Sequence, residues 1–158
     1  PRRPGQWMDP GALGSLGVGT GFAMAAKLAN PEKEVMCLYG DGAFGMTAFD
    51  METAQRFGAP YLAVVGNNSA MNQIRYGQIT KYGQERGDVG NKLGDVPFGT
   101  FGEMIGGHGE EVREAKAIRP ALDRARDAIA RTGKCAVVNV WVDPNEYAPG
   151  TKAQTMYK

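Results

Sequence analysis

Two oxygen-bearing side chains stand directly after two apolar segments of the chain. Asp41 lies in a Gly-Asp-Gly motif after residues 34–40, and Asn68 ends an Asn-Asn pair after residues 61–67. Carboxylate and amide oxygens are hard ligands that suit Mg²⁺ or Ca²⁺. Two side chains do not fill the shell of Mg²⁺, which commonly completes it with water and ligand phosphates. The pair therefore predicts a metal that is shared with a phosphate-bearing cofactor.

Each motif has a simpler interpretation when it is taken alone. Gly-Asp-Gly is typical of a turn, and Asn-Asn is typical of a strand cap. Their occurrence after two apolar strands, with one helix between them, favours a common site, because the carboxyl ends of neighbouring parallel strands meet at one edge of a sheet. Gly42 would let the backbone approach a phosphate closely, and the next helix would turn its free N–H groups toward the anion.

The elements that would position this site alternate between strand and helix. Continuous apolar runs predict buried strands at residues 34–40, 61–67 and 135–143. Helices are expected at about 15–28, at 47–58 with Phe49, Thr53 and Phe57 spaced i, i+4, i+8 before a stop at Gly58, and at 117–133 through Ile118, Leu122, Ala125 and Ile129. The order predicts an α/β fold with an open, mainly parallel sheet flanked by helices. Residues 76–100 are polar and Gly-rich and are expected to form a long functional or disordered loop.

Composition narrows the class of protein. The chain has 158 residues, enough for one domain, and a net charge of +1, which offers no electrostatic case for nucleic acid or an anionic membrane. Cys37 and Cys135 lie in apolar runs without metal-type spacing, so we expect reduced, buried thiols and a cytoplasmic protein. No signal peptide or membrane span is visible. We expect one domain at 1–146 and a tail at 147–158 that either closes over the site or is a disordered terminus.

Gly40-Asp41-Gly42, followed 27 positions after Asp41 by Asn68, resembles the cofactor signature of thiamine-diphosphate enzymes. The resemblance runs from about Gln6 to Asp143, and it is to the diphosphate-binding domain of the acetolactate synthase and decarboxylase superfamily. It implies that Asp41, Asn68 and the backbone carbonyl of Ala70 bind Mg²⁺. It further implies a cofactor site that includes Gly14, Ser15, Leu16, Gly40, Asp41, Gly42, Ala43, Asn68, Ala70 and Met71.

The first Gly-rich stretch, residues 14–17, resembles the segment that receives the aminopyrimidine ring of the cofactor. The resemblance implies that the carbonyl of Gly14 accepts a hydrogen bond from the ring's exocyclic amine. It also implies that Leu16 forces the cofactor into a bent shape, which holds the amino nitrogen beside the reactive carbon. Without the family, Leu16 is simply a buried residue at a helix start.

One catalytic part has no counterpart in the chain. In this superfamily a glutamate of a separate pyrimidine-binding domain, usually on a neighbouring subunit, starts the reaction. Glu52 lies in a helix after the Gly-Asp-Gly motif and is expected to be a surface or packing residue. The resemblance therefore implies a homo- or hetero-oligomer in which a partner supplies the glutamate. A non-catalytic, cofactor-binding regulatory subunit is the alternative.

Within the superfamily, residues 14–26, 40–60 and the tail most resemble the 2-hydroxyacyl-CoA lyase and oxalyl-CoA decarboxylase branch. Ile74 stands where pyruvate-decarboxylase-type enzymes carry a catalytic glutamate. The branch implies cleavage of a 2-hydroxyacyl-CoA to formyl-CoA and an aldehyde or ketone, with the cofactor as electron sink. Asn72 and Gln73 are candidates for contacting the reacting centre, or else are polar caps of a helix. Acetolactate synthase, which acts on free keto acids, remains an enzymatic alternative, and His108 fits a loop histidine better than a general base.

Overall fold

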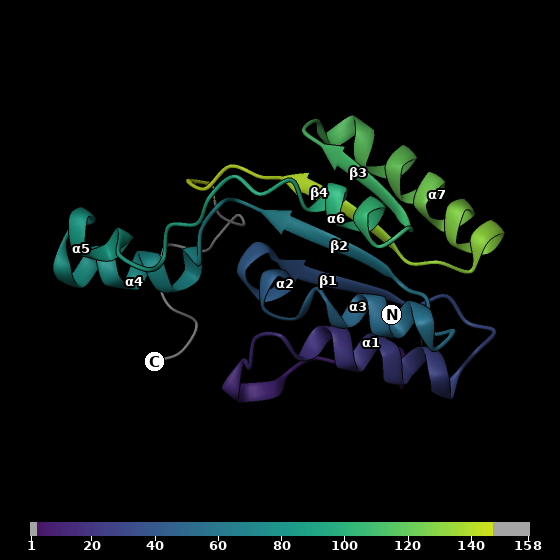
Figure 1. Ribbon diagram of the computed structural model, residues 1–158. Coiled ribbons are helices and arrows are strands. Elements are labelled where there is room, and N and C mark those ends of the chain that lie inside the picture. Colours follow the sequence, from purple (N-terminus) through teal and green to yellow (C-terminus); the bar gives the residue numbers. More distant parts are fainter. Residues whose placement is uncertain (1–2, 147–158) are drawn as a thin grey trace.

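Four parallel strands form one open sheet in the computed structural model, which describes residues 3–146 (Figure 1). The strands are β1 (Met36–Gly40), β2 (Leu62–Asn67), β3 (His108–Val112) and β4 (Ala136–Trp141). Their order across the sheet is β1-β2-β4-β3, and each neighbouring pair is parallel. The expected α/β fold with a parallel sheet is therefore confirmed, and all carboxyl ends point to one edge.

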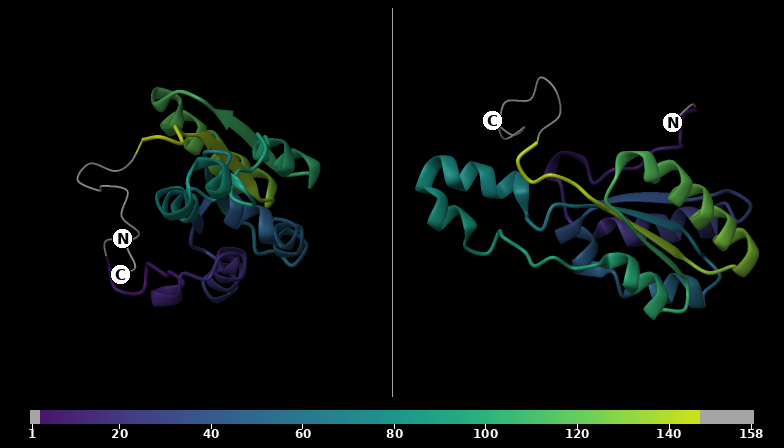
Figure 2. Two further views of the ribbon diagram at one scale, coloured as in Figure 1. Left: turned by 90° about the vertical axis from the view of Figure 1, so that its left-hand side faces the viewer. Right: turned by 90° about the horizontal axis from the view of Figure 1, so that it is seen from above.

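Helices cover both faces of this sheet (Figure 2). A short 3₁₀ helix, η1 (Gly11–Leu13), precedes the α-helices α1 (Val18–Ala29), α2 (Asp41–Thr47), α3 (Asp50–Arg56), α4 (Asn72–Tyr82), α5 (Gln84–Asp88), α6 (Phe98–Met104) and α7 (Ala115–Thr132). Side chains of α1, α2, α3 and α6 pack on one face, and α7 packs on the other. By contrast, α4 and α5 extend beyond the carboxyl ends of the strands (Figure 1).

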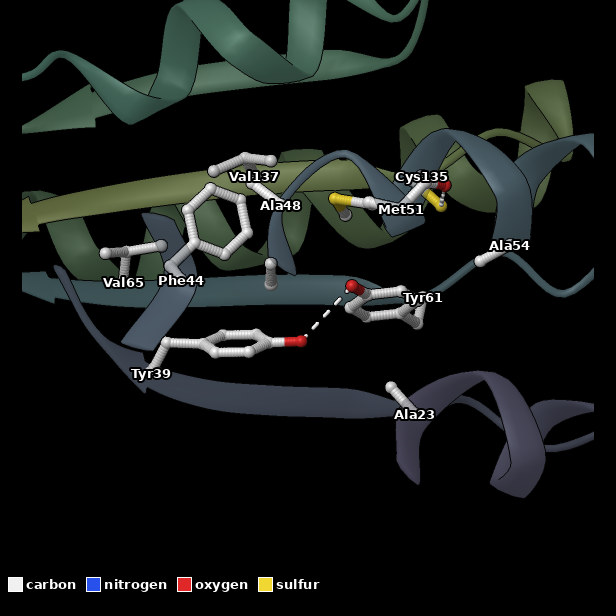
Figure 3. Packing of buried hydrophobic residues seen from close by; sticks show 11 residues of the cluster. Ala23, Tyr39, Phe44, Ala48, Met51, Ala54, Tyr61, Val65, Cys135 and Val137 are labelled. Carbon is white, nitrogen blue, oxygen red and sulfur yellow. Dashed lines mark hydrogen bonds between the residues drawn. The ribbon is translucent and has the colours of Figure 1, made fainter. Parts of the chain in front are cut away.

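The larger core lies between the sheet and the first group of helices (Figure 3). Phe44 of α2 is fully buried, and its ring contacts Tyr39, Phe98 and Phe101 edge-on at centroid distances of 5.2, 5.3 and 5.8 Å. The hydroxyl groups of Tyr39 and Tyr61 share a hydrogen bond of 3.2 Å within this core (Figure 3). Burial raises the pKa of Tyr61 to about 12 and raises that of Tyr39 further, so both rings stay neutral.

The predicted apolar positions of α7 are confirmed. Ala125 is fully buried, and Ile118, Leu122 and Ile129 pack on the second cluster, against strand residues such as Val138. Their i, i+4 spacing places them on the stripe that faces the sheet.

Three expectations about elements are corrected, and one strand was not predicted. Residues 34–40 were expected to form a buried strand, but β1 is an edge strand with Met36 and Leu38 56% and 59% exposed. Phe49 and Phe57 do not form the buried stripe of α3, because Met51 and Ala54 face the sheet and the two rings are 73% and 64% exposed. Residues 76–100 are not one irregular loop, because they contain α5, most of α4 and the start of α6. Strand β3 was not predicted, because its sequence, His-Gly-Glu-Glu-Val, has no apolar run.

Candidate functional site

The structure brings Asp41 and the loop that contains Asn68 together at the carboxyl edge of the sheet. Gly40 of β1 pairs with Gly66 of β2, so the residues that follow the two strands are neighbours. The Asp41 side chain is nearly buried, at 4% exposure. Its Oδ2 accepts hydrogen bonds from the backbone N–H groups of Asn68 (3.2 Å) and Ala70 (3.0 Å), and Oδ1 accepts one from Gly42 (2.7 Å). One carboxylate therefore ties the end of β1 to the loop after β2.

Ser69, between Asn68 and Ala70, has an unusual backbone conformation. Its φ of 56° makes it the only non-glycine residue in the described range 3–146 with a left-handed backbone. Three contacts hold it there: its N–H donates to Asn67 Oδ1 (3.1 Å), its hydroxyl donates to Asp95 Oδ1 (2.5 Å), and its carbonyl accepts from the N–H of Leu93 (2.7 Å). A left-handed backbone is unfavourable for an L-amino acid other than glycine, so these contacts stabilise a turn that the chain would not adopt by itself.

Helices α4 and α5 form a helical hairpin that extends from the turn at Ser69. Met71 donates to the carbonyl of Asn91 at 2.7 Å, and Ala70 pairs with Lys92 in an isolated antiparallel bridge. Within the hairpin, Arg75 Nε donates to Asp88 Oδ1 at 2.6 Å. Hydrogen bonds from Gln84 and Arg75 lower the pKa of Asp88. The hairpin therefore begins and ends at the same loop as the predicted metal ligands.

Asn72 and Gln73 lie at the first turn of α4. The Asn72 side-chain amide donates to the carbonyl of Pro144 at 2.6 Å, which connects α4 to the segment after β4. Gln73 is exposed. The two candidates thus differ in surroundings: one is engaged with the backbone, and the other faces outward.

The turn at residues 14–17 is held to α2 through Gly17. Gly14 and Gly17 have φ angles of 59° and 84°, conformations that suit glycine. Thr47 Oγ1 donates to the carbonyl of Gly17 at 2.9 Å and contacts Thr20 Oγ1 at 3.0 Å, and Thr20 in turn contacts the Tyr39 hydroxyl at 3.1 Å. A chain of hydroxyl groups therefore connects the core to this turn.

Two residues of the predicted cofactor set have a different environment from the one expected of them. Leu16 is 51% exposed and is not part of a helix start, because α1 begins at Val18. Gly42 is required by a close contact: a Cβ placed there would lie 2.0 Å from Met71 Sδ. Met71 thus covers Gly42 at the start of α2.

The donor set at this edge fits a hard cation with a phosphate ligand. Residues 3–146 hold no group of three His, Cys, Asp or Glu side chains that could bind a metal, so a cation here depends on one carboxylate with amide and carbonyl oxygens. A cavity of about 540 Å³ borders the loop, lined among others by Asn68, Ala70, Lys92 and Arg113. The Arg113 guanidinium lies 4.5 Å from the centre of the Trp141 ring. Oxygen ligands and nearby positive charge suit an anionic cofactor.

His108 is remote from this edge. It is the first residue of β3, at the amino end of a parallel strand, and its Nε2 lies 2.9 Å from Glu110 Oε1. Burial acts to raise the pKa of Glu110, but the hydrogen bonds from Arg124 and His108 outweigh it and hold that pKa below its usual value. His108 therefore belongs to a hydrogen-bond network with Glu110 of β3 and Arg124 of α7.

Sequence reasoning missed Asp95 and Asn67 as supports of the loop. Asn67 is fully buried, and its amide nitrogen donates to the carbonyl of Val96 at 2.9 Å. The doubled Asn was a usable signal for Asn67. No pattern marked Asp95, because its contact with Ser69 spans 26 residues of the chain.

Comparison with known proteins identifies the family to which this sheet and its site belong. The model of one family, described as "Thiamine pyrophosphate enzyme, C-terminal TPP binding domain", matches residues 1–140. The chain belongs to this family, as a thiamine-pyrophosphate-binding domain.

Curated relatives carry two kinds of name. The chain is 36% identical to 2-hydroxyacyl-CoA lyase 2 of Mus musculus over 152 residues, which cover 96% of this chain and 24% of the relative. It is 38% identical to a probable acetolactate synthase of Mycobacterium bovis over 146 residues, 92% of this chain and 26% of the relative. The chain thus spans about a quarter of the length of these relatives. No helix between residues 3 and 146 has the length and apolarity to cross a membrane.

Proposed function

We propose that the chain is the diphosphate- and Mg²⁺-binding part of a thiamine-diphosphate-dependent carbon–carbon lyase that cleaves 2-hydroxyacyl-CoA to formyl-CoA and an aldehyde or ketone. The observation that carries the proposal is the Asp41 carboxylate, which ends β1 and holds the N–H groups of Asn68 and Ala70 after β2. These bonds hold the segments of all three proposed oxygen ligands next to each other, which supports a common site.

Asp41, the Asn68 side chain and the Ala70 carbonyl would hold the cation. A carboxylate has about four lone-pair positions, and three of those of Asp41 are taken by backbone N–H groups, which leaves one for a metal. The same N–H bonds fix the direction of that lone pair. The fixed turn at Ser69 would orient the Ala70 carbonyl toward the cation.

The remaining cofactor contacts follow the elements around this centre. The backbone of Gly40, Gly42 and Ala43 would face the diphosphate, and Gly14, Ser15, Leu16 and Met71 would flank the rings. When bound, the cofactor supplies an electron sink for the breaking carbon–carbon bond. The exposed apolar side chain of Leu16 would bend it and exclude water from the reacting carbon.

The substrate class rests on relatives and on one departure. Several relatives bear the name 2-hydroxyacyl-CoA lyase 2, and Ile74 stands where pyruvate decarboxylases carry a glutamate. We propose that the exposed Gln73 contacts the substrate and that Asn72 positions the segment after β4. The proposed lid at 147–158 lies outside the described residues. Acetolactate synthase and oxalyl-CoA decarboxylase are the enzymatic alternatives.

The active site would be completed by a glutamate from a pyrimidine-binding domain or subunit. Among the acids of the described chain, Glu52 forms an i, i+4 pair with Arg56, at 3.2 Å on the outer side of α3. Glu52 therefore stabilises the surface of α3 through this ion pair. A second, non-enzymatic candidate is a regulatory subunit that binds cofactor without turnover, which the same half-site would support.

The decisive assay offers two substrates to the assembled enzyme. With thiamine diphosphate and Mg²⁺ present, we expect formyl-CoA from a 2-hydroxyacyl-CoA and no product from pyruvate. Acetolactate from pyruvate without formyl-CoA would select the acetolactate synthase alternative. Cofactor binding without either product would select the regulatory subunit.

A further inference from the structure

Four hydroxyl groups form a continuous chain from the core to the turn before α1. The Tyr61 hydroxyl lies 3.2 Å from that of Tyr39 (Figure 3). The Tyr39 hydroxyl lies 3.1 Å from Thr20 Oγ1, which lies 3.0 Å from Thr47 Oγ1. The chain ends where Thr47 Oγ1 donates to the carbonyl of Gly17 at 2.9 Å. We call the side chains of Tyr61, Tyr39, Thr20 and Thr47 together the hydroxyl chain.

One direction of donation satisfies every contact of the hydroxyl chain. Each hydroxyl has a single proton, and that of Thr47 is used by the bond to Gly17. Thr20 therefore donates to Thr47. It follows that Tyr39 donates to Thr20, and that the Tyr61 hydroxyl donates to Tyr39. Hydrogen bonds that run in one direction polarise and strengthen one another, so the whole chain strengthens the bond to Gly17.

The hydroxyl chain is not suited to carrying protons. Its inner end lies in the core, because Tyr61 and Thr20 are fully buried and Tyr39 is nearly so. Burial raises the pKa of both tyrosines, so they keep their protons near neutral pH. Apolar side chains of the same shape, Phe and Val, would fill the same space without any buried polar group. The hydroxyl groups are therefore best explained by the carbonyl that they hold.

The hydroxyl chain joins the turn at residues 14–17 to both ends of α2. Thr47 is the last residue of this helix. A Cβ placed on Gly17 would lie 3.1 Å from Thr47 Cγ2, so the turn and the helix are in close contact. At the other end, Tyr39 lies on β1 shortly before Asp41, with which α2 begins. The chain thus connects the turn to the segment that carries the proposed metal ligand.

We infer that Thr47 is a positioning residue that fixes the turn at residues 14–17 relative to α2. The other members of the hydroxyl chain support it. The inference rests on the proposed function, in which the turn flanks the rings of the cofactor and the start of α2 binds its diphosphate and Mg²⁺. A cofactor that spans both segments requires a fixed separation between them. Thr47 would act through Gly17 on Leu16, its neighbour in sequence.

Nuclear magnetic resonance of the cofactor-free chain tests the bond to Gly17 directly. Gly17 and Val18 form the only Gly-Val pair among the 158 residues. Labelling glycine with ¹³C at the carbonyl and valine with ¹⁵N therefore gives a single signal in a spectrum that correlates the two atoms. We expect Thr47→Val to move the Gly17 carbonyl signal to lower chemical shift, because the carbonyl loses a hydrogen bond. Thr47→Ser keeps the hydroxyl and should restore the signal.

Two further variants test the support and the specificity. Tyr39→Phe removes a hydroxyl that lies two members further along the chain, and it should move the Gly17 signal in the same direction by a smaller amount. Thr132→Val is the matched control, since Thr132 Oγ1 donates to the carbonyl of Ala128 on α7 at 2.7 Å, and it should leave the signal in place. No response to Tyr39→Phe would overturn the support by the chain. No response to Thr47→Val, or an equal response to Thr132→Val, would overturn the inference.

Calorimetry with two ligands separates positioning from a general loss of stability. With Mg²⁺, inorganic pyrophosphate should use only the diphosphate end of the site, whereas thiamine diphosphate should also contact the turn. We expect Thr47→Val to weaken thiamine diphosphate binding about fivefold and pyrophosphate binding less than about twofold, and Thr47→Ser to restore the first. Circular dichroism checks that each variant folds.

The two measurements also separate this inference from the proposed function. Equal losses of affinity for the two ligands, or no loss for either, would overturn the positioning role while leaving the cofactor site in place. Binding of neither ligand by the unaltered chain would reject the proposed function. The Gly17 carbonyl signal would then still decide whether Thr47 fixes the turn.

Discussion

Ser69 offers the sharpest perturbation of the proposed metal loop, because its backbone strain and its side-chain bond can be changed separately. Ser69→Ala removes the hydroxyl that donates to Asp95 and keeps a Cβ in the left-handed conformation. Ser69→Gly removes the same hydroxyl and also relieves the left-handed backbone. Both variants therefore lose the hydrogen bond to Asp95, and only Ser69→Gly also relieves the left-handed backbone.

The magnitudes follow from those two contributions. A hydrogen bond to a charged group contributes about 1.5–3 kcal/mol, and the lower value applies to this exposed pair. A left-handed non-glycine residue costs about 1 kcal/mol. Ser69→Ala should thus lose about 1.5 kcal/mol and Ser69→Gly about 0.5 kcal/mol. Because 1.4 kcal/mol is a factor of about ten, Mg²⁺ affinity should fall up to about tenfold in the first variant and about twofold in the second.

Calorimetric titration of Mg²⁺ into the chain with saturating thiamine diphosphate measures these affinities. Asp95→Ala should match Ser69→Ala, and the double variant should lose no more than either single one, since both remove the same bond. Identical affinities in Ser69→Ala and Ser69→Gly would refute the argument from backbone strain. Additive losses in the double variant would refute the Ser69–Asp95 pairing.

Three further predictions concern packing, thiol chemistry and pH. Gly19→Ala in α1 should lower the melting temperature, because its Cβ would lie 2.7 Å from the Tyr39 ring. Gly21→Ala has nothing within 4 Å of its Cβ and should raise the melting temperature through better helix propensity. The reverse order of melting temperatures in a thermal scan would contradict the packing of α1 on Tyr39. Burial raises the pKa of the Cys135 thiol to about 11, so iodoacetamide at pH 8 should label it only on unfolding, and rapid labelling of the folded chain would contradict its burial. Because the pKa of Asp88 is lowered in the folded chain, its contribution to hairpin stability is present above its ordinary pKa and is lost as pH falls through the lowered value. Hydrogen exchange in α4 and α5, corrected for intrinsic rates, should therefore accelerate relative to β2 on acidification to pH 3, and an unchanged ratio would show that this contact contributes nothing.

Much of the fold was predictable because an element that packs on the core carries apolar residues in a regular local pattern. Strands β2 and β4 are buried apolar runs, and α7 carries its apolar residues at helical spacing. The apolar run of β1 predicted its strand but not its burial, because β1 lies at the edge of the sheet with Met36 and Leu38 exposed. The juxtaposition of Asp41 and the Asn68 loop followed from parallel topology alone. Local pattern and tertiary structure agree at these positions.

The rest depended on contacts that no local pattern encodes. Phe49 and Phe57 form a helical apolar stripe, but periodicity does not tell which side of a helix meets the sheet, and Met51 and Ala54 occupy that side. Strand β3 is held by pairing with β4 although Glu110 and Glu111 give it a polar sequence. The hydrogen bond from Ser69 to Asp95 joins distant parts of the chain, and the local sequence around neither residue predicts it.

We propose above all that Asp41 organises a Mg²⁺-dependent thiamine-diphosphate site. Calorimetry of thiamine diphosphate binding to the Asp41→Ala variant, in the presence of Mg²⁺, tests it most directly, with circular dichroism to confirm the fold. We predict that Mg²⁺-dependent binding is lost while the parallel sheet persists, because the variant lacks both the proposed ligand and the bonds to Asn68 and Ala70. Cofactor affinity equal to that of the unaltered chain would contradict this role of Asp41.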